Sequence, residues 1–151
     1  MNDRLDEMEM PGRQARLLTE DGVSGRVELS EYVWHYDEPP EKGGSSTAPT
    51  PVDHLLGSLS ACFAVTLRTE ASKHDFDFNH LDITGNARPE TGFVEEIYLA
   101  IQIATKQPAD QIETVLTHTE RSCNILKLIR EDVPVTIEFE QVQVNAADGS
   151  E

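Results

Sequence analysis

The sequence predicts an α+β fold in which a mostly antiparallel sheet wraps around two central helices. Two kinds of segment predict it: strands with two-residue alternation, and two long stretches with apolar residues three and four positions apart. Their order along the chain is strands, helix, strands, helix, strand, which is typical of α+β domains. With 151 residues, the chain can bury a core without a metal or a disulfide framework. We therefore expect a single domain over residues 13–144, between tails at 1–12 and 145–151.

The first strands are expected within residues 13–18 and 23–36. The second of these segments has a phase slip near Ser30 and Glu31, which indicates a turn between two strands of a meander. Residues 37–51 follow, with the sequence DEPPEKGGSSTAPTP. Because prolines and adjacent glycines oppose helix and strand, this segment is predicted to be a long loop without regular structure.

The first helix is expected to begin near Thr50 or Pro51 and to end near Lys73 or His74. Thr50 suits the N-cap and Pro51 the first helical position, while Asp53 takes the place of the usual capping-box glutamate. The apolar arc of this helix is wider than a surface helix needs, and small residues are interspersed along it. We therefore predict a buried central helix, with Cys62 on its apolar face.

The second half of the chain is predicted to fold as a hairpin, a helix and a last strand. The hairpin strands are LDITGNARP and EEIYLAIQIAT, with PETG as the turn between them. A helix opens after Pro108 and should break near residues 122–124, so that Cys123 lies on or near a buried face. The last strand is expected within VPVTIEFEQVQV.

The chain is strongly acidic. Twelve Lys and Arg against 28 Asp and Glu give a net charge of −16, which disfavours binding to nucleic acid or to an anionic membrane. Either a basic partner or adaptation to high salt explains this acidity, and the even scatter of acids with few lysines favours an acidic halophile surface. Such a surface predicts a melting temperature that rises from low to molar salt.

The N-terminal sequence MNDRLDEMEMPG predicts a cytoplasmic location. It lacks the basic and apolar regions of a signal peptide, and the apolar stretch at 55–67 is too short to span a bilayer. Cysteines in the cytoplasm are more often free, redox-cycling or buried than joined in a permanent disulfide.

The histidines and glycines give no pattern typical of a metal or phosphate site. The five histidines show no HxxxH spacing, and the paired glycines at 43–44 lack the Lys-Ser/Thr that follows in a phosphate-binding loop. His54 is interpreted as a helix-start residue that faces solvent or a partner chain. No bound metal or cofactor is therefore predicted.

The two cysteines, Cys62 and Cys123, leave two interpretations open. Composition alone favours Cys62 as a small buried apolar residue. The alternative is a nucleophilic thiol, whose pKa would have to be lowered by a helix N-terminus or a cationic side chain. Cys123 would then capture the sulfenic acid of Cys62 as a disulfide.

Two motifs in this order resemble the OsmC/Ohr superfamily. The first is DEPPEKGGSSTAPTPVDHLLGSLSACFAVTL, with a Gly-rich loop, a TP-x-[DE]-x-LL helix start and a cysteine in the following helix. The second is CNILKLIREDVPVTIEF, which resembles the segment around the superfamily's other thiol. The resemblance covers residues 13–144 and implies an intertwined homodimer with thiol sites at its interface.

The resemblance also implies a thiol-dependent peroxidase active in oxidative stress. Cys62 would attack an organic hydroperoxide, Cys123 would form the disulfide, and an external dithiol, often protein-bound lipoyl, would reduce it without a resident cofactor. Arg26, preferred over Arg16, and Asp53 would activate the thiolate and position the peroxide.

The sequence departs from the better-studied branches of this superfamily at two positions. Val52 stands where they have a glutamate, and Asn124 stands where proline is frequent. The TPVDHLL helix start is more similar to the less characterised OsmC-like branch. Two alternatives therefore accompany the peroxidase: a non-enzymatic domain that binds or senses a small hydrophobic or thiol ligand, and a thiol protein acting on another sulfur electrophile, such as a persulfide.

Overall fold

The computed structural model describes residues 12–19 and 22–144. It confirms the α+β class, with two three-stranded sheets and three α-helices among these residues. The predicted tails fall outside the described residues, apart from Gly12. The chain divides after Asp53 into two compact units.

The first unit contains an antiparallel meander of three strands. These are β1 (Arg16–Thr19), β2 (Gly25–Leu29) and β3 (Tyr32–Tyr36), with β2 in the middle. Ser30 has a φ of 56° in the tight turn between β2 and β3. The predicted change of phase at this point is thus a hairpin turn.

The loop after β3 contains a short 3-10 helix, η1 (Pro40–Lys42), so the prediction of no regular structure there is wrong. Proline fits the first turn of a helix because the N–H that it lacks has no partner there. Gly43 ends the turn with a φ of 88°. A Cβ atom on Gly44 would collide with the Glu38 carbonyl, so the paired glycines serve this turn.

Asp37 holds this loop together from its start. Its side chain is buried and accepts hydrogen bonds from the Thr47 amide at 3.0 Å and the Thr47 hydroxyl at 2.8 Å. It also accepts bonds from the amides of Glu38 and Ser45, at 2.8 and 3.1 Å. These bonds, chiefly those from Thr47, lower the pKa of Asp37 to about 2.

We expect Asp37→Ala to open this loop. Limited proteolysis should cut residues 38–49 faster in the variant than in the parent, whereas Asp82→Ala, on an exposed strand position, should leave the cleavage rate unchanged. Because folding lowers the pKa of Asp37 from 3.8 to about 2, its stabilising effect is present above about pH 4 and lost towards pH 2. The difference in melting temperature between parent and variant should therefore shrink in acid; a constant difference would contradict this role.

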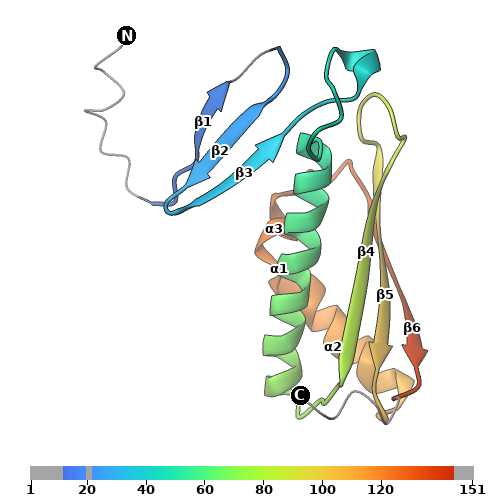
Figure 1. The fold of residues 1–151 in the computed structure, drawn as a ribbon. Helices are drawn as coiled ribbons and strands as arrows, with labels where there is room; N and C mark the ends of the chain where they lie inside the picture. The colour runs from blue at the N-terminus through green and yellow to red at the C-terminus, as the bar shows by residue number, and fades with distance from the viewer. Residues whose placement is uncertain (1–11, 20–21, 145–151) are drawn as a thin grey trace. The chain divides into compact units, whose positions relative to one another are not determined.

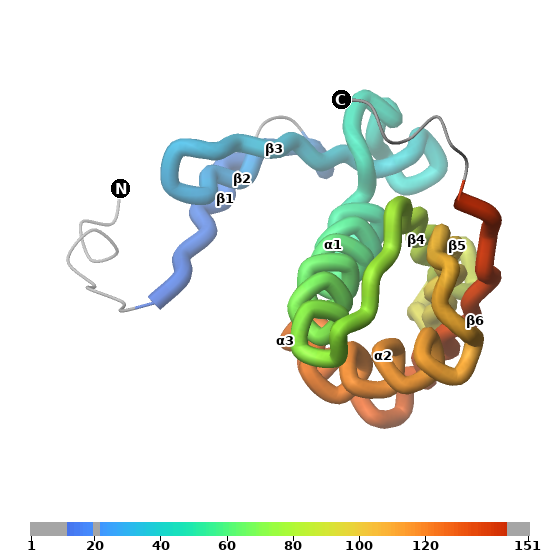
Figure 2. The backbone as a smooth tube through the Cα atoms, turned by 90° about the horizontal axis from the view of Figure 1, so that it is seen from below, coloured from blue at the N-terminus to red at the C-terminus, as the bar shows by residue number. Residues whose placement is uncertain are grey.

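The second unit packs helices on a three-stranded sheet. Helix α1 (Pro51–Lys73) begins in the last residues of the first unit and is followed by β4 (His80–Arg88) and β5 (Glu96–Ala104). Two helices then lead to the last strand: α2 (Ala109–Ser122), α3 (Asn124–Leu128) and β6 (Val135–Val142). Helices α1 and α2 run along the same side of the sheet (Figures 1 and 2).

The sheet has the order β4-β5-β6, with an antiparallel and a parallel pairing. Strand β5 is antiparallel to β4, with Ile83 opposite Ile101, and parallel to β6, with Ile101 opposite Phe139. Parallel pairing needs a long crossover, and α2 with α3 supplies it. The crossover therefore places the segment around Cys123 beside the helical layer.

The core of the second unit lies between the sheet and the two long helices. Alternate residues of β5 point into it, and one face of α1 and of α2 covers them; the largest of these buried side chains are Leu59, Phe63, Leu67, Leu99, Ile101, Ile103 and Ile112. Burial of each such side chain contributes about 1.5–3 kcal/mol to stability. This rigid frame holds the face of α1 that carries Cys62.

Helix α1 has the predicted bounds and cap. The Asp53 amide donates to the Thr50 hydroxyl at 3.2 Å, and the Asp53 carboxylate accepts from the Thr50 amide at 2.9 Å, which is a reciprocal capping box. One face of this predicted buried helix lies in the core, but Leu55 and Val65 are 42% and 69% exposed. A single chain supplies packing partners for one face only. No helix in the described part of the chain is both long and apolar enough to cross a bilayer.

Candidate active site: a pair of thiols

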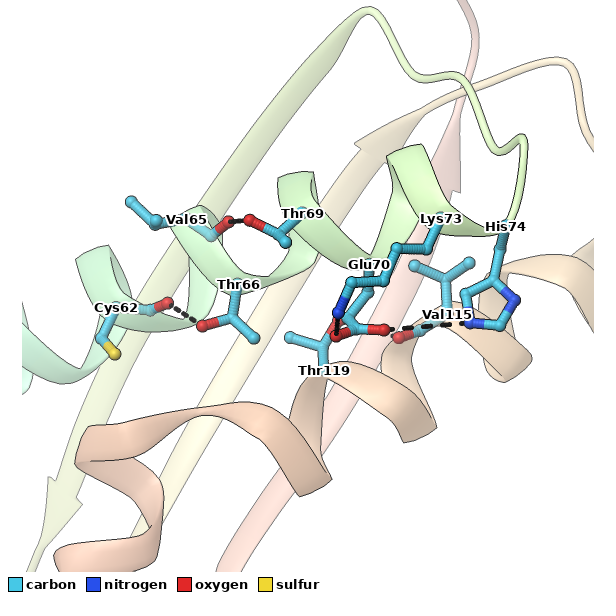
Figure 3. Close-up of polar contacts among 9 residues, drawn as sticks. All are labelled: Cys62, Val65, Thr66, Thr69, Glu70, Lys73, His74, Val115 and Thr119. Carbon is cyan, nitrogen blue, oxygen red and sulfur yellow. Dashed lines mark hydrogen bonds and ion pairs between the residues drawn. The ribbon is translucent and has the colours of Figure 1, made fainter.

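Two helical elements bring Cys62 and Cys123 together. Cys62 lies in the middle of α1 and is partly exposed, with its sulfur on the side that faces α2 and α3 (Figure 3). Cys123 is fully buried between the end of α2 and the start of α3. The predicted break at residues 122–124 is confirmed, since Cys123 has extended dihedral angles of −69° and 114°.

The Cys62 sulfur receives hydrogen bonds from the start of α3. Burial raises the pKa of the Cys62 thiol, but the Ile125 amide, the Cys123 thiol and the Asn124 amide all donate to it and lower the pKa further than burial raises it. The Thr66 hydroxyl adds the smallest contribution and also donates to the Cys62 carbonyl at 2.8 Å. The net pKa lies below the ordinary thiol value, which favours the nucleophilic thiolate.

Cys123 is shifted in the opposite direction. Burial raises its pKa, the Leu126 amide lowers it, and the hydrogen bond and negative charge of the Cys62 thiolate raise it again. Cys123 therefore stays protonated, and its S–H group donates a hydrogen bond to the Cys62 sulfur. Both cysteines are free rather than joined in a disulfide.

This arrangement suits two-step thiol chemistry. One sulfur has a lowered pKa and is partly exposed, and the other has a raised pKa, is buried and is in hydrogen-bonding contact with the first. A thiolate attacks an electrophile, and a neighbouring thiol can then displace the product as a disulfide. The pairing supports the interpretation of Cys62 as a nucleophilic thiol, although Cys62 also packs against the core.

The other predicted site residues lie in the first unit. Arg26 is in β2 with its guanidinium 3.5 Å from the Glu28 carboxylate, and Arg16 opens β1. Asp53 is exposed, and its carboxylate also accepts the Thr50 hydroxyl at 2.8 Å. These contacts give Asp53 a capping role in the helix start. The action of Asp53 and Arg26 on the thiol stays a prediction.

The backbone amides of Asn124 and Ile125 also belong to the candidate site, and they were not predicted. Side-chain patterns carry no signal for them. The predicted break after α2 could have indicated them, because the first amides of any helix lack partners within that helix. In this protein, the Cys62 sulfur accepts the hydrogen bonds of these two amides.

The model of the OsmC-like protein family matches residues 43–138, which include both cysteines and more than half of the chain. This chain belongs to the OsmC-like family. No curated protein matches the sequence. In this OsmC-like chain the match begins at Gly43 in the Gly-rich loop, includes the whole of α1 and ends at Glu138 within β6.

Solved structures with the same fold accompany the family match. An OsmC-like protein from Mycoplasma pneumoniae has a TM-score of 0.75 at 16% identity, covering 90% of this chain and 100% of its own. An organic hydroperoxide resistance protein OsmC from Legionella pneumophila has a TM-score of 0.67 at 22% identity, covering 91% and 100%. The organic hydroperoxide resistance protein OhrB of Bacillus subtilis has a TM-score of 0.66 at 16% identity, covering 85% of this chain and 98% of its own.

Proposed function

We propose that this OsmC-like protein reduces organic hydroperoxides through Cys62 and Cys123. The observation that carries the proposal is the hydrogen-bonded pair of thiols, in which the pKa of Cys62 is lowered and that of Cys123 raised. The names of the Legionella and Bacillus relatives support organic hydroperoxides as the substrate class.

The reaction has three steps. The Cys62 thiolate attacks the outer oxygen of ROOH, the O–O bond breaks, and the alkoxide takes up a proton to leave as ROH, so that Cys62 becomes a sulfenic acid. The Cys123 sulfur then attacks the Cys62 sulfur, which forms the disulfide and releases water. An external dithiol, such as a protein-bound lipoyl group, reduces the disulfide by thiol–disulfide exchange and is itself oxidised.

Each group at the site has a distinct task in these steps. The amides of Ile125 and Asn124 stabilise the thiolate before attack. Cys123 is already in contact with the reacting sulfur, so disulfide formation needs only small movements. Arg26 and Asp53 are the proposed residues for positioning the peroxide.

The exposed apolar residues of α1 support a homodimer. Leu55 and Val65 of α1 are exposed and leave apolar surface in solvent. A second copy of the chain is the proposed cover, as the family resemblance implies. Sedimentation equilibrium should give twice the chain mass of 16.8 kDa, and Val65→Glu should shift the species to a monomer; a parent that sediments as a monomer would refute this partner.

A peroxide-consumption assay tests the proposed activity. The parent protein is mixed with cumene hydroperoxide and dihydrolipoamide in low and in molar salt, and peroxide loss is followed against buffer. We expect many turnovers per chain, and hydrogen peroxide should be a poorer substrate. Loss no faster than in buffer under both conditions would refute the peroxidase.

A further inference from the structure

A cluster of potential metal ligands, separate from the two thiols, lies at the C-terminal end of α1. Glu70 of α1, His74 directly after its end and His118 of α2 each offer one ligand atom, and these atoms all lie within 4.8 Å of one another. It is the one such group of three among the residues that the structure describes. The histidines show no HxxxH spacing because the ligands come from two separate segments, 44 residues apart at their closest in sequence.

We propose that Glu70, His74 and His118 form a binding site for a zinc ion that joins α1 to α2. Two imidazoles and one carboxylate are a frequent ligand set for zinc when a water fills the fourth position. This site is separate from the thiols, and the proposal does not depend on the peroxidase activity. Cys62 is two helical turns away from Glu70 along α1, or about 12 Å.

The two helices fix the positions of the three ligands. His74 follows the last residue of α1, and its amide donates to the Glu70 carbonyl, so the two side chains lie on one side with 3.8 Å between the Glu70 Oε2 and His74 Nε2 atoms. His118 stacks on His74 with 4.4 Å between ring centroids. Its neighbours Val115 and Thr119 are buried, which holds this part of α2 against the core.

Only small side-chain rotations separate this arrangement from a zinc site. Ligand atoms around a tetrahedral zinc are about 3.3 Å apart, given metal–ligand bonds of about 2.0–2.1 Å. The ligand atoms, now within 4.8 Å of one another, would therefore move closer by up to about 1.5 Å, with the two imidazole rings turning their nitrogens towards the ion. The His74 side chain is 34% exposed and has room to turn.

Burial of Glu70 gives a reason for a cation at this place. Its side chain is only 7% exposed, and a buried carboxylate needs a positive partner. Lys73 fills this role with its Nζ atom 2.9 Å from the Glu70 Oε1 atom (Figure 3), and Ser122 donates a further hydrogen bond. The Lys73 side chain is 61% exposed, so it can swing into solvent when zinc takes its place.

Competition between Lys73 and zinc makes the proposal specific. Removal of the ammonium group in Lys73→Ala should tighten zinc binding, because the repulsion between the two cations disappears. Removal of His74 or His118 should weaken it at least about tenfold, since even the outer partners of metal ligands are worth 10–100-fold in affinity. Opposite effects from neighbouring residues would not follow from adventitious surface binding.

Zinc titration of the untagged protein tests the site. Competition with a zinc-binding dye should give one ion per chain for the parent, for Cys62→Ser and for His80→Ala, an exposed histidine outside the cluster. Affinity should fall at least about tenfold in His74→Ala and His118→Ala and rise in Lys73→Ala. Zinc should also raise the melting temperature of the parent but not of the His118 variant.

Several results would overturn the site. They are a parent that binds no zinc, His74 and His118 variants that bind as the parent does, or weaker binding in Lys73→Ala. Binding lost in Cys62→Ser instead would assign the ion to the thiols. If His118→Ala fails to fold, the more exposed His74→Ala and the Lys73→Ala variant still decide the question.

Discussion

Cys62→Ser is expected to abolish hydroperoxide reduction. A serine hydroxyl stays protonated at neutral pH and cannot become a sulfenic acid, so turnover should fall by at least about a thousandfold, as for other lost nucleophiles. The substitution is nearly isosteric, and Cys62 is only partly buried, so the fold should persist. Peroxide loss in the presence of dihydrolipoamide measures the effect, with far-UV circular dichroism as a check on folding.

Cys123→Ser is the matched control for this prediction. It leaves the first step intact, so the variant should consume about one hydroperoxide per chain in a rapid phase and then slow down. The slow phase depends on direct reduction of the sulfenic acid by the external dithiol. Unchanged turnover in Cys62→Ser, or a rapid phase that requires Cys123, would contradict the assigned roles.

Asn124→Pro is expected to make Cys62 less reactive without disturbing the helices. Proline lacks the N–H that donates to the Cys62 sulfur, so the pKa of Cys62 should rise. Asn124 is the first residue of α3, where proline is tolerated, and the extended ψ of 114° at Cys123 suits a residue before proline. A hydrogen bond to a charged group contributes about 1.5–3 kcal/mol, so the alkylation rate at neutral pH should fall about tenfold or more.

Iodoacetamide labelling, read peptide by peptide, measures this effect at Cys62 alone. In the parent, the rate should reach its plateau at a pH below that of an ordinary thiol, and in Asn124→Pro at a higher pH. Asn124→Ala keeps the backbone N–H and should label as the parent does. Equal rates in all three proteins would show that the amide of residue 124 does not stabilise the thiolate.

Local patterns predicted the elements of this fold well. Thr50, Pro51 and Asp53 gave the start of α1 because capping depends on residues a few positions apart. The phase slip at Ser30 gave the β2–β3 turn, and the break before Asn124 gave the end of α2. The 3-10 turn at Pro40 was missed because prolines oppose long helices but fit a single turn.

Contacts between segments that are distant in the sequence could not be predicted from local patterns. Cys62 and Cys123 are 61 residues apart, and their contact depends on how α2 and α3 cross back to the sheet. The resemblance to a family, rather than spacing, indicated the pair. In the cluster of Glu70, His74 and His118, only the spacing of the first two is local, and the contact with His118 depends on the packing of α1 against α2.

Exposed residues on α1 show the other limit. The wide apolar arc of this helix predicted a buried central helix. One chain covers only the face with Leu59 and Phe63, and leaves Val65 exposed. Apolar periodicity predicts that a helix face is buried, but it does not indicate whether the same chain or a second copy covers that face.

The mass of the oxidised protein tests the central claim, that Cys62 and Cys123 act as one redox pair. Reduced protein is treated with one equivalent of cumene hydroperoxide, digested without reductant and analysed by mass spectrometry. We predict a loss of two hydrogens per chain and a cross-linked peptide pair containing both cysteines, absent from Cys62→Ser and from Cys123→Ser. An oxidised parent with Cys62 as a stable sulfinic acid and Cys123 still a free thiol would contradict the account.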